Sequence, residues 1–294
     1  LINLNEARKA VGDTVGIVEA YVRARRVFEH NEGPESASAA DALHREGSWR
    51  PAGGDTPATA HALARAIAIL NAPRQVGLPL AESLLERAQV HLAVGEIDSS
   101  ITLATRARDI YLKLVGPSDS RVGSCFMAIG HAQRAAYRNE DALSSYLEAL
   151  AVYERSAPPD AAGLNNCLRM LASQALDLAR YSEAHGYARR ALRASPGVWG
   201  DRSTETAVTR LAYAATLYAS RQPDSARVHY EMARDDIRAN LGESNPLLAE
   251  PILRLATLAR ERGDLAQARA AAERALDLLE RGEASENPRL SEAH

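Results

Sequence analysis

The sequence predicts an all-α protein, a right-handed superhelical solenoid of antiparallel helix pairs, and three observations lead to this fold class. A pattern of small residues recurs five times at a constant period of forty-two positions. Within each copy, apolar residues follow the three- and four-residue spacing of amphipathic helices. In the last copy, Gly263 and Asp264 divide the two helices by supplying a helix stop and then an N-cap residue. Repetition with such a period is typical of a helical repeat array.

Three positions of the repeat always hold a small side chain, and they follow one another at a fixed spacing in every copy. The third of them is always alanine. In chain order these positions hold Ala88, Ser100 and Ala107; Gly130, Ala142 and Ala149; Ala172, Ala184 and Ala191; Ala214, Ala226 and Ala233; and Ala256, Ala268 and Ala275. We expect two antiparallel helices to approach most closely here, because a larger side chain would cost about 1–3 kcal/mol in overpacking.

The repeat resembles that of the tetratricopeptide family, which places Leu-Gly or Leu-Ala on helix A and Ala, an aromatic residue and Ala on helix B. The matching residues of the second copy are Ile129, Gly130, Ala142, Tyr146, Ala149 and Leu150. The usual repeat has about 34 residues, and the longer period here resembles the kinesin light chain type found in bacterial multidomain proteins. The link Leu241–Ala249 also resembles that subtype. The resemblance implies a scaffold whose A helices line a concave groove.

We predict five full repeats over residues 78–281. Before them we expect an N-terminal amphipathic helix over residues 1–30, a small and polar linker over 31–40, and a degenerate repeat over 41–77. Glycine and proline weaken the first helix of that degenerate repeat. Residues 282–294 are interpreted as the start of a further repeat or as a capping tail.

The two ends of the chain carry further signals. An apolar stripe marks the N-terminal helix, and it consists of Leu4, Val11, Val15, Val18, Val22 and Phe28. A second interpretation of this stripe is a helix that folds back into the groove and autoinhibits it. At the other end, Asn287-Pro288 lies one full period after Asn245-Pro246. With a first residue that is not Met, this pattern favours a piece of a longer protein over a capped end.

Charge and hydropathy bear on the partners and the compartment. The formal net charge is −3, so no global positive field draws the chain to nucleic acid. Charged residues interrupt every apolar stretch well before the roughly 18 residues that a membrane span requires. No secretory signal is present in the sequence, which leaves the compartment open and favours the cytoplasm.

The cysteine and histidine spacing predicts neither a metal site nor a cofactor. Cys125 and Cys167 occupy the same position of adjacent repeats. Helices in a stack lie about 8–10 Å apart, whereas a disulfide needs Cα atoms within about 7 Å, so we predict two free thiols. No nucleophile signature such as Gly-x-Ser-x-Gly is present, and we do not expect an enzyme.

The resemblance also implies which residues face the groove, since the family places them at fixed positions of helix A. The binding candidates are Met127, His131, Arg134, Arg169, Ser173, Leu211, Tyr218, Arg254 and Arg260. Apolar and arginine side chains together would suit an amphipathic or acidic-apolar protein segment. Alternatively, the Leu and Met side chains simply pack between neighbouring A helices.

Neither peptide-recognition mode of the family can be transferred to this sequence. The Lys and Asn set that binds C-terminal carboxylates is missing. The groove asparagine of kinesin light chain-like members is replaced by Glu86, Ala128, Met170, Ala212 and Arg254. The predicted function is therefore a scaffold or adaptor that binds a protein or peptide of unknown identity. The alternative is a regulatory or substrate-recruiting arm of a larger kinase or protease-like enzyme whose catalytic domain lies outside this chain.

Overall fold

The computed structural model describes residue 8 and residues 13–49, 56–71 and 77–286. Every regular element of this part of the chain is a helix, which confirms the predicted all-α class. The chain divides into two compact units, residues 1–159 and residues 160–294, and each is described by itself. No helix of the described part is both long enough and apolar enough to span a membrane.

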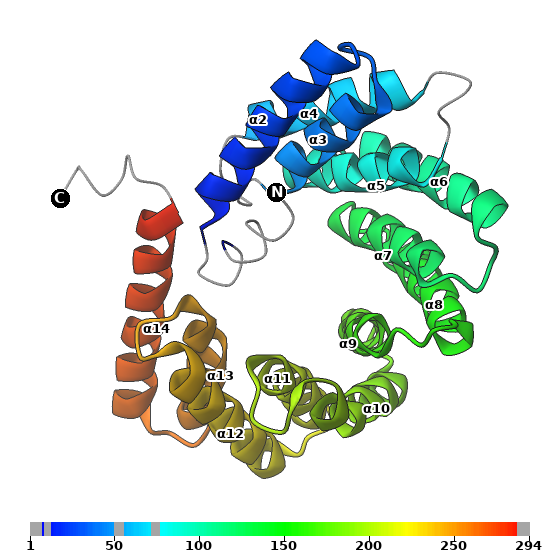
Figure 1. The fold of residues 1–294 in the computed structure, drawn as a ribbon. Helices are drawn as coiled ribbons and strands as arrows, with labels where there is room; N and C mark the ends of the chain where they lie inside the picture. Colours follow the sequence, from blue (N-terminus) through cyan, green and yellow to red (C-terminus); the bar gives the residue numbers. More distant parts are fainter. Residues whose placement is uncertain (1–7, 9–12, 50–55, 72–76, 287–294) are drawn as a thin grey trace. The chain divides into compact units, whose positions relative to one another are not determined.

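The first unit contains seven helices in the described ranges, and consecutive helices pack against each other (Figure 1). They are α2 (Thr14–Asn31), α3 (Ala37–Ser48), α4 (Thr56–Leu70), α5 (Leu78–Ala93), α6 (Ile97–Leu114), α7 (Ser120–Ala135) and α8 (Asn139–Arg155). Its main apolar core draws residues from α3 through α8. The pairs α5–α6 and α7–α8 are two successive repeats.

The second unit continues the same pattern of helix pairs. Its elements are α9 (Ala161–Asp177), α10 (Tyr181–Trp199), α11 (Thr204–Ala219), α12 (Pro223–Leu241), the short 3-10 helix η1 (Pro246–Leu248), α13 (Ala249–Glu261) and α14 (Leu265–Glu286). The B helices of the two units begin at residues 97, 139, 181, 223 and 265, which are evenly spaced by one repeat period. The period read from the sequence is therefore the period of the helix pairs.

The small positions of the repeat lie where the two helices of a pair meet. All of them are buried except Ala268, which is half-buried. A Cβ atom on Gly130 would lie 2.5 Å from Cε1 of Tyr146, which packs across from α8. The ring of Tyr146 therefore uses the space that a side chain at Gly130 would need, as expected for a close approach of helices.

The segment between the N-terminal helix and the repeats is more helical than expected. Helix α3 begins at Ala37, so the linker expected over residues 31–40 is shorter, and the Ser36 hydroxyl caps α3 by accepting from the Ala39 amide at 3.2 Å. Gly47 lies inside α3, where a Cβ would come within 2.8 Å of Leu63. This glycine allows α3 and α4 to pack closely instead of ending the helix.

The apolar stripe predicted for the N-terminal helix is wrong in phase. Helix α2 buries Ile17, Ala20 and Ala24, whereas Val15 is 67% exposed. The physical reason is its packing on α3, to which Arg25 is joined by an ion pair with Glu46 at 3.0 Å. Leu4 and Val11 of the stripe, and the Asn287-Pro288 signal, lie outside the described residues.

Candidate functional site

The nine predicted binding residues lie on A helices of both units. Met127, His131 and Arg134 lie on α7 of the first unit. The other six lie on α9, α11 and α13 of the second unit, and they are Arg169, Ser173, Leu211, Tyr218, Arg254 and Arg260. Their exposure ranges from buried, as for Met127 and Leu211, to exposed, as for Arg254 and Arg260, so they do not form one uniform surface.

The three candidates on α7 are buried or half-buried against neighbouring helices. The Met127 side chain is only 5% exposed and packs in the interior, as the alternative interpretation of the groove residues anticipated. His131 Nδ1 lies 2.8 Å from the Tyr146 hydroxyl, and burial, together with nearby Arg134, lowers the pKa of the imidazole. His131 is therefore held by helix α8, and both it and Arg134 are half-buried.

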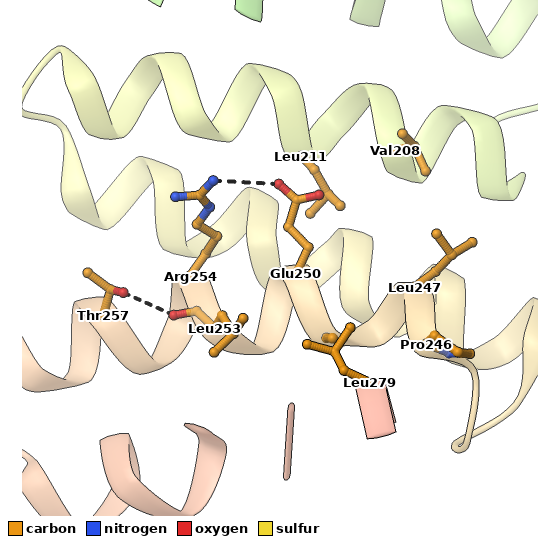
Figure 2. A pocket seen from close by; sticks show the side chains of 10 residues that line it. Val208, Leu211, Pro246, Leu247, Glu250, Leu253, Arg254, Thr257 and Leu279 are labelled. Atoms are coloured by element: carbon orange, nitrogen blue, oxygen red, sulfur yellow. Dashed lines mark hydrogen bonds and ion pairs between the residues drawn. The ribbon is translucent and has the colours of Figure 1, made fainter. Parts of the chain in front are cut away.

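In the second unit, a cleft of about 470 Å³ opens beside α11 and α13. We call this space the α11–α13 cleft. It is lined by Val208 and Leu211 of α11, Pro246 and Leu247 of η1, Ala249, Glu250, Leu253, Arg254 and Thr257 of α13, and Leu279 of α14. Figure 2 shows the α11 side chains facing those of α13, with Leu279 reaching in from α14. Two of the predicted binding residues, Leu211 and Arg254, thus line the same cleft.

The walls of the cleft are apolar and one side carries charge. Leu247, Leu253 and Leu279 are each more than two-fifths exposed, which is unusual for leucines that lie so close together. Glu250 and Arg254 form an ion pair at 3.7 Å, one helical turn apart on α13 (Figure 2). Because both side chains are more than half exposed, water screens this pair and it remains available to a partner.

Leu279 was not among the predicted groove residues, because it belongs to a B helix. The equivalent position of the preceding repeat is Ile237, which is fully buried in the core of that repeat. Leu279 keeps the apolar character of that core position, yet it is 43% exposed. The sequence does carry one signal for Leu279: an apolar residue at a position whose counterpart in the preceding repeat is part of the core.

One arginine beside this cleft has no acidic partner in the part of the chain that the structure describes. Arg169 of α9 occupies the same repeat position as Leu211 and Leu253, and it donates a hydrogen bond to Asn166 Oδ1 at 2.9 Å. Within the described residues, no carboxylate lies within ion-pair distance of it. Burial lowers the pKa of this guanidinium, and the charge of Glu250 opposes that shift.

The remaining candidates of the second unit lie along the same A helices. Ser173 is half-buried on α9 and Arg260 is exposed on α13. Tyr218 of α11 donates a hydrogen bond to Glu261 of α13, so these two helices are joined beyond the cleft. This bond, followed by burial, raises the pKa of the Tyr218 hydroxyl.

The described residues contain no set of three His, Cys, Asp or Glu side chains arranged to hold a metal ion. Cys125 and Cys167 are both buried and are not joined by a disulfide, as predicted. Burial raises the pKa of the Cys125 thiol to about 12, so this sulfur stays protonated and inert.

The fold and the cleft define the class of protein as a helical repeat scaffold. Residues 205–281, which include α11 to α13 and most of α14, match the model of the Tetratricopeptide repeat family. The helix pairs of the described residues have the tetratricopeptide repeat fold. This fold is generally a non-catalytic scaffold for protein interactions. A search of curated proteins finds no match.

Solved structures with the same fold are distant in sequence. BtubC (BKLC) of P. vanneervenii is 21% identical with a TM-score of 0.62, covering 82% of this chain and 92% of its own. The TPR-like repeats of a Podosopora anserina kinesin light chain-like protein are 14% identical with a TM-score of 0.59, and the match covers 70% of this chain and 99% of that one. Aspartyl phosphate phosphatase F of Bacillus subtilis is 16% identical with a TM-score of 0.65, and the match covers 90% of this chain and 68% of the phosphatase chain.

Proposed function

We propose that this chain is a scaffold or adaptor that holds a segment of a partner protein in the α11–α13 cleft. The observation that carries this proposal is the cleft itself, whose exposed leucines Leu247, Leu253 and Leu279 surround one space. A single aliphatic side chain buried there would contribute about 1.5–3 kcal/mol of transfer free energy. Clusters of this kind are typical anchor sites at protein interfaces.

A protein segment fits this cleft better than a small metabolite does. The polar groups at its rim are an exposed ion pair and the Thr257 hydroxyl, which already donates to the Leu253 carbonyl at 3.0 Å. A specific small-molecule site usually has several convergent polar groups that fix the orientation of the ligand. Here the apolar anchor is central and the charges are peripheral, which is the arrangement of protein interfaces.

Site-specific photocrosslinking in lysate of the source organism tests this proposal. A photoreactive residue in place of Leu253 should crosslink to one protein, and that protein should be lost when Leu279→Asp is added. A matched probe replaces Leu147 of α8, which is also 41% exposed but lies outside the cleft. Equal crosslinking from both positions, or none from position 253, would contradict binding in the cleft.

The second candidate function is a regulatory or recruiting arm of a larger enzyme. The likeness to phosphatase F favours it, because the match leaves part of that longer chain outside the shared fold. Sequencing the complete reading frame tests this candidate: an adjoining catalytic domain would support it, and a frame that encodes helical repeats alone would refute it.

A further inference from the structure

The A helices of the second unit place three different side chains in one row. Arg169, Leu211 and Leu253 lie at the same repeat position of α9, α11 and α13. Helices α9 and α11 are in contact, and the cleft lies between α11 and α13. The row therefore runs from a cationic position to an apolar space.

Arg169 is the unusual member of this row. Arg169 is half-buried and has no carboxylate within ion-pair distance among the described residues, and this burial lowers the pKa of its guanidinium. Other half-buried arginines of the same unit have such partners: Arg227 pairs with Glu231 at 3.0 Å, and Arg234 with Asp235 at 2.8 Å. A half-buried cation without a carboxylate partner gains from an incoming anion, because folding has already removed part of its water.

The hydrogen bond to Asn166 orients this cation. Asn166 lies one turn before Arg169 on α9, and its Oδ1 accepts from Nη2. One terminal nitrogen is thereby held, which leaves the other guanidinium donors for a carboxylate, the group that arginine binds in two-point geometry.

We propose that the partner segment carries an acidic side chain that pairs with Arg169, followed or preceded by an aliphatic residue that enters the α11–α13 cleft. This inference rests on the proposed function and specifies the chemistry of its partner. Neighbouring packed helices lie about 8–10 Å apart, and an extended chain advances about 3.3 Å per residue. The cleft lies beyond α11 as seen from α9, about one and a half helix spacings or roughly 12–15 Å away, so an extended segment would separate the two anchors by about four residues.

A fully randomised peptide display library, selected on the whole chain, tests the inference. We expect the selected peptides to share Asp or Glu about four residues from Leu, Ile or Met. A selected sequence is then synthesised with an amidated C-terminus, so that any carboxylate that pairs with Arg169 belongs to a side chain. Its affinity is measured by fluorescence anisotropy.

Substitutions at the two anchors, with one control elsewhere, separate their contributions. Arg169→Gln should weaken binding by about 10- to 100-fold, and Arg169→Lys should weaken it less because the charge remains. Leu253→Asp should also abolish most of the affinity. Arg234→Gln, which removes another half-buried arginine of the same unit, should leave the affinity unchanged. The Arg169→Glu variant should recover binding to a peptide whose acidic residue is replaced by Lys.

The outcomes distinguish this inference from the proposed function. Peptides that require Leu253 but lack an acid, and bind Arg169→Gln normally, would overturn the inference and leave binding in the cleft intact. A library that yields no peptide dependent on Leu253 would overturn both. Loss of the peptide when its C-terminus is amidated would assign the carboxylate to a chain end and also overturn the inference.

Discussion

At the scale of single residues, the turn between the two helices of a repeat requires a left-handed backbone. Positions 95, 137, 179, 221 and 263 all have positive φ, and they recur once in every repeat. Glycine occupies the first and last, whereas Tyr137, Ala179 and Arg221 adopt φ values of 56–60°. For a residue with a Cβ, this conformation raises the free energy by about 1–2 kcal/mol, so three turns of the array are strained.

Replacing Ala179 with glycine should therefore stabilise the protein. We expect a gain of about 0.5–1 kcal/mol, because the relief of left-handed strain exceeds the added entropy of the unfolded chain. Urea unfolding followed by circular dichroism measures it. The matched control is Ala270→Gly, an exposed alanine inside helix α14, which should lose about 1 kcal/mol. Similar losses in both variants would refute the strain argument.

The buried carboxylate of Asp236 is a second single-residue determinant of stability. Asp236 of α12 accepts from Arg210 at 2.6 Å and from Arg202 at 2.8 Å; the side chains of Asp236 and Arg210 are 8% exposed and that of Arg202 is 74% exposed. Removing one partner of a buried pair leaves an uncompensated charge, which typically costs about 3–5 kcal/mol.

We expect Asp236→Ala to lower the free energy of unfolding by that amount, because it leaves the buried Arg210 without its carboxylate. Arg202→Ala should have little effect, because Asp236 still pairs with Arg210 and the Arg202 side chain is largely in water. Thermal unfolding of the two variants provides the comparison. A larger loss for Arg202→Ala than for Asp236→Ala would show that the exposed arginine, and not the buried one, determines the energy of this cluster.

At the scale of helices, one position of the array exchanges an aromatic contact for a polar one. In the second repeat, Gly123 gives room to Tyr153, whose ring would lie 2.9 Å from a Cβ there. The equivalent pair in the third repeat is Asn165 and Ser195. Asn165 donates to the Ala191 carbonyl at 2.7 Å and to Ser195 at 3.1 Å, and accepts from Thr209 at 3.3 Å. This one amide joins α9, α10 and α11.

Asn165→Ala should therefore destabilise the second unit by about 1–3 kcal/mol, because it leaves buried polar groups unpaired and a small cavity. The double variant Asn165→Gly with Ser195→Tyr recreates the pair found at Gly123 and Tyr153. We expect it to recover most of the loss in urea unfolding. A double variant less stable than Asn165→Ala would mean that the two repeats are not interchangeable at this position.

At the scale of the whole molecule, each compact unit has its own apolar core. One core draws on α3 to α8, and another on α11 to α14. In repeat proteins each repeat depends mainly on its neighbours, so a division between repeats preserves most of the stabilising contacts. Both units should therefore fold as separate fragments.

Fragments of residues 1–159 and 160–294 should each show helical circular dichroism and a cooperative unfolding transition. The control is a fragment of residues 160–221, which keeps α9 to α11 but loses the rest of its core and should unfold without cooperativity. If neither long fragment unfolds cooperatively, the division into two compact units does not describe the folding of this chain.

The sequence predicted the helix pairs, their period and the small residues at their contacts, because these depend on local spacing. Through the family resemblance it also gave Leu211 and Arg254 as binding candidates; both line the cleft, and their role in binding stays a prediction. The exposure of each position depends on neighbouring helices instead. Met127 and Leu253 share a repeat position, yet one is 5% exposed and the other 41%. Sequence periodicity thus determined the repeat, and tertiary packing decided which repeat carries an open apolar cleft, because only packing fixes which side chains the next helix covers.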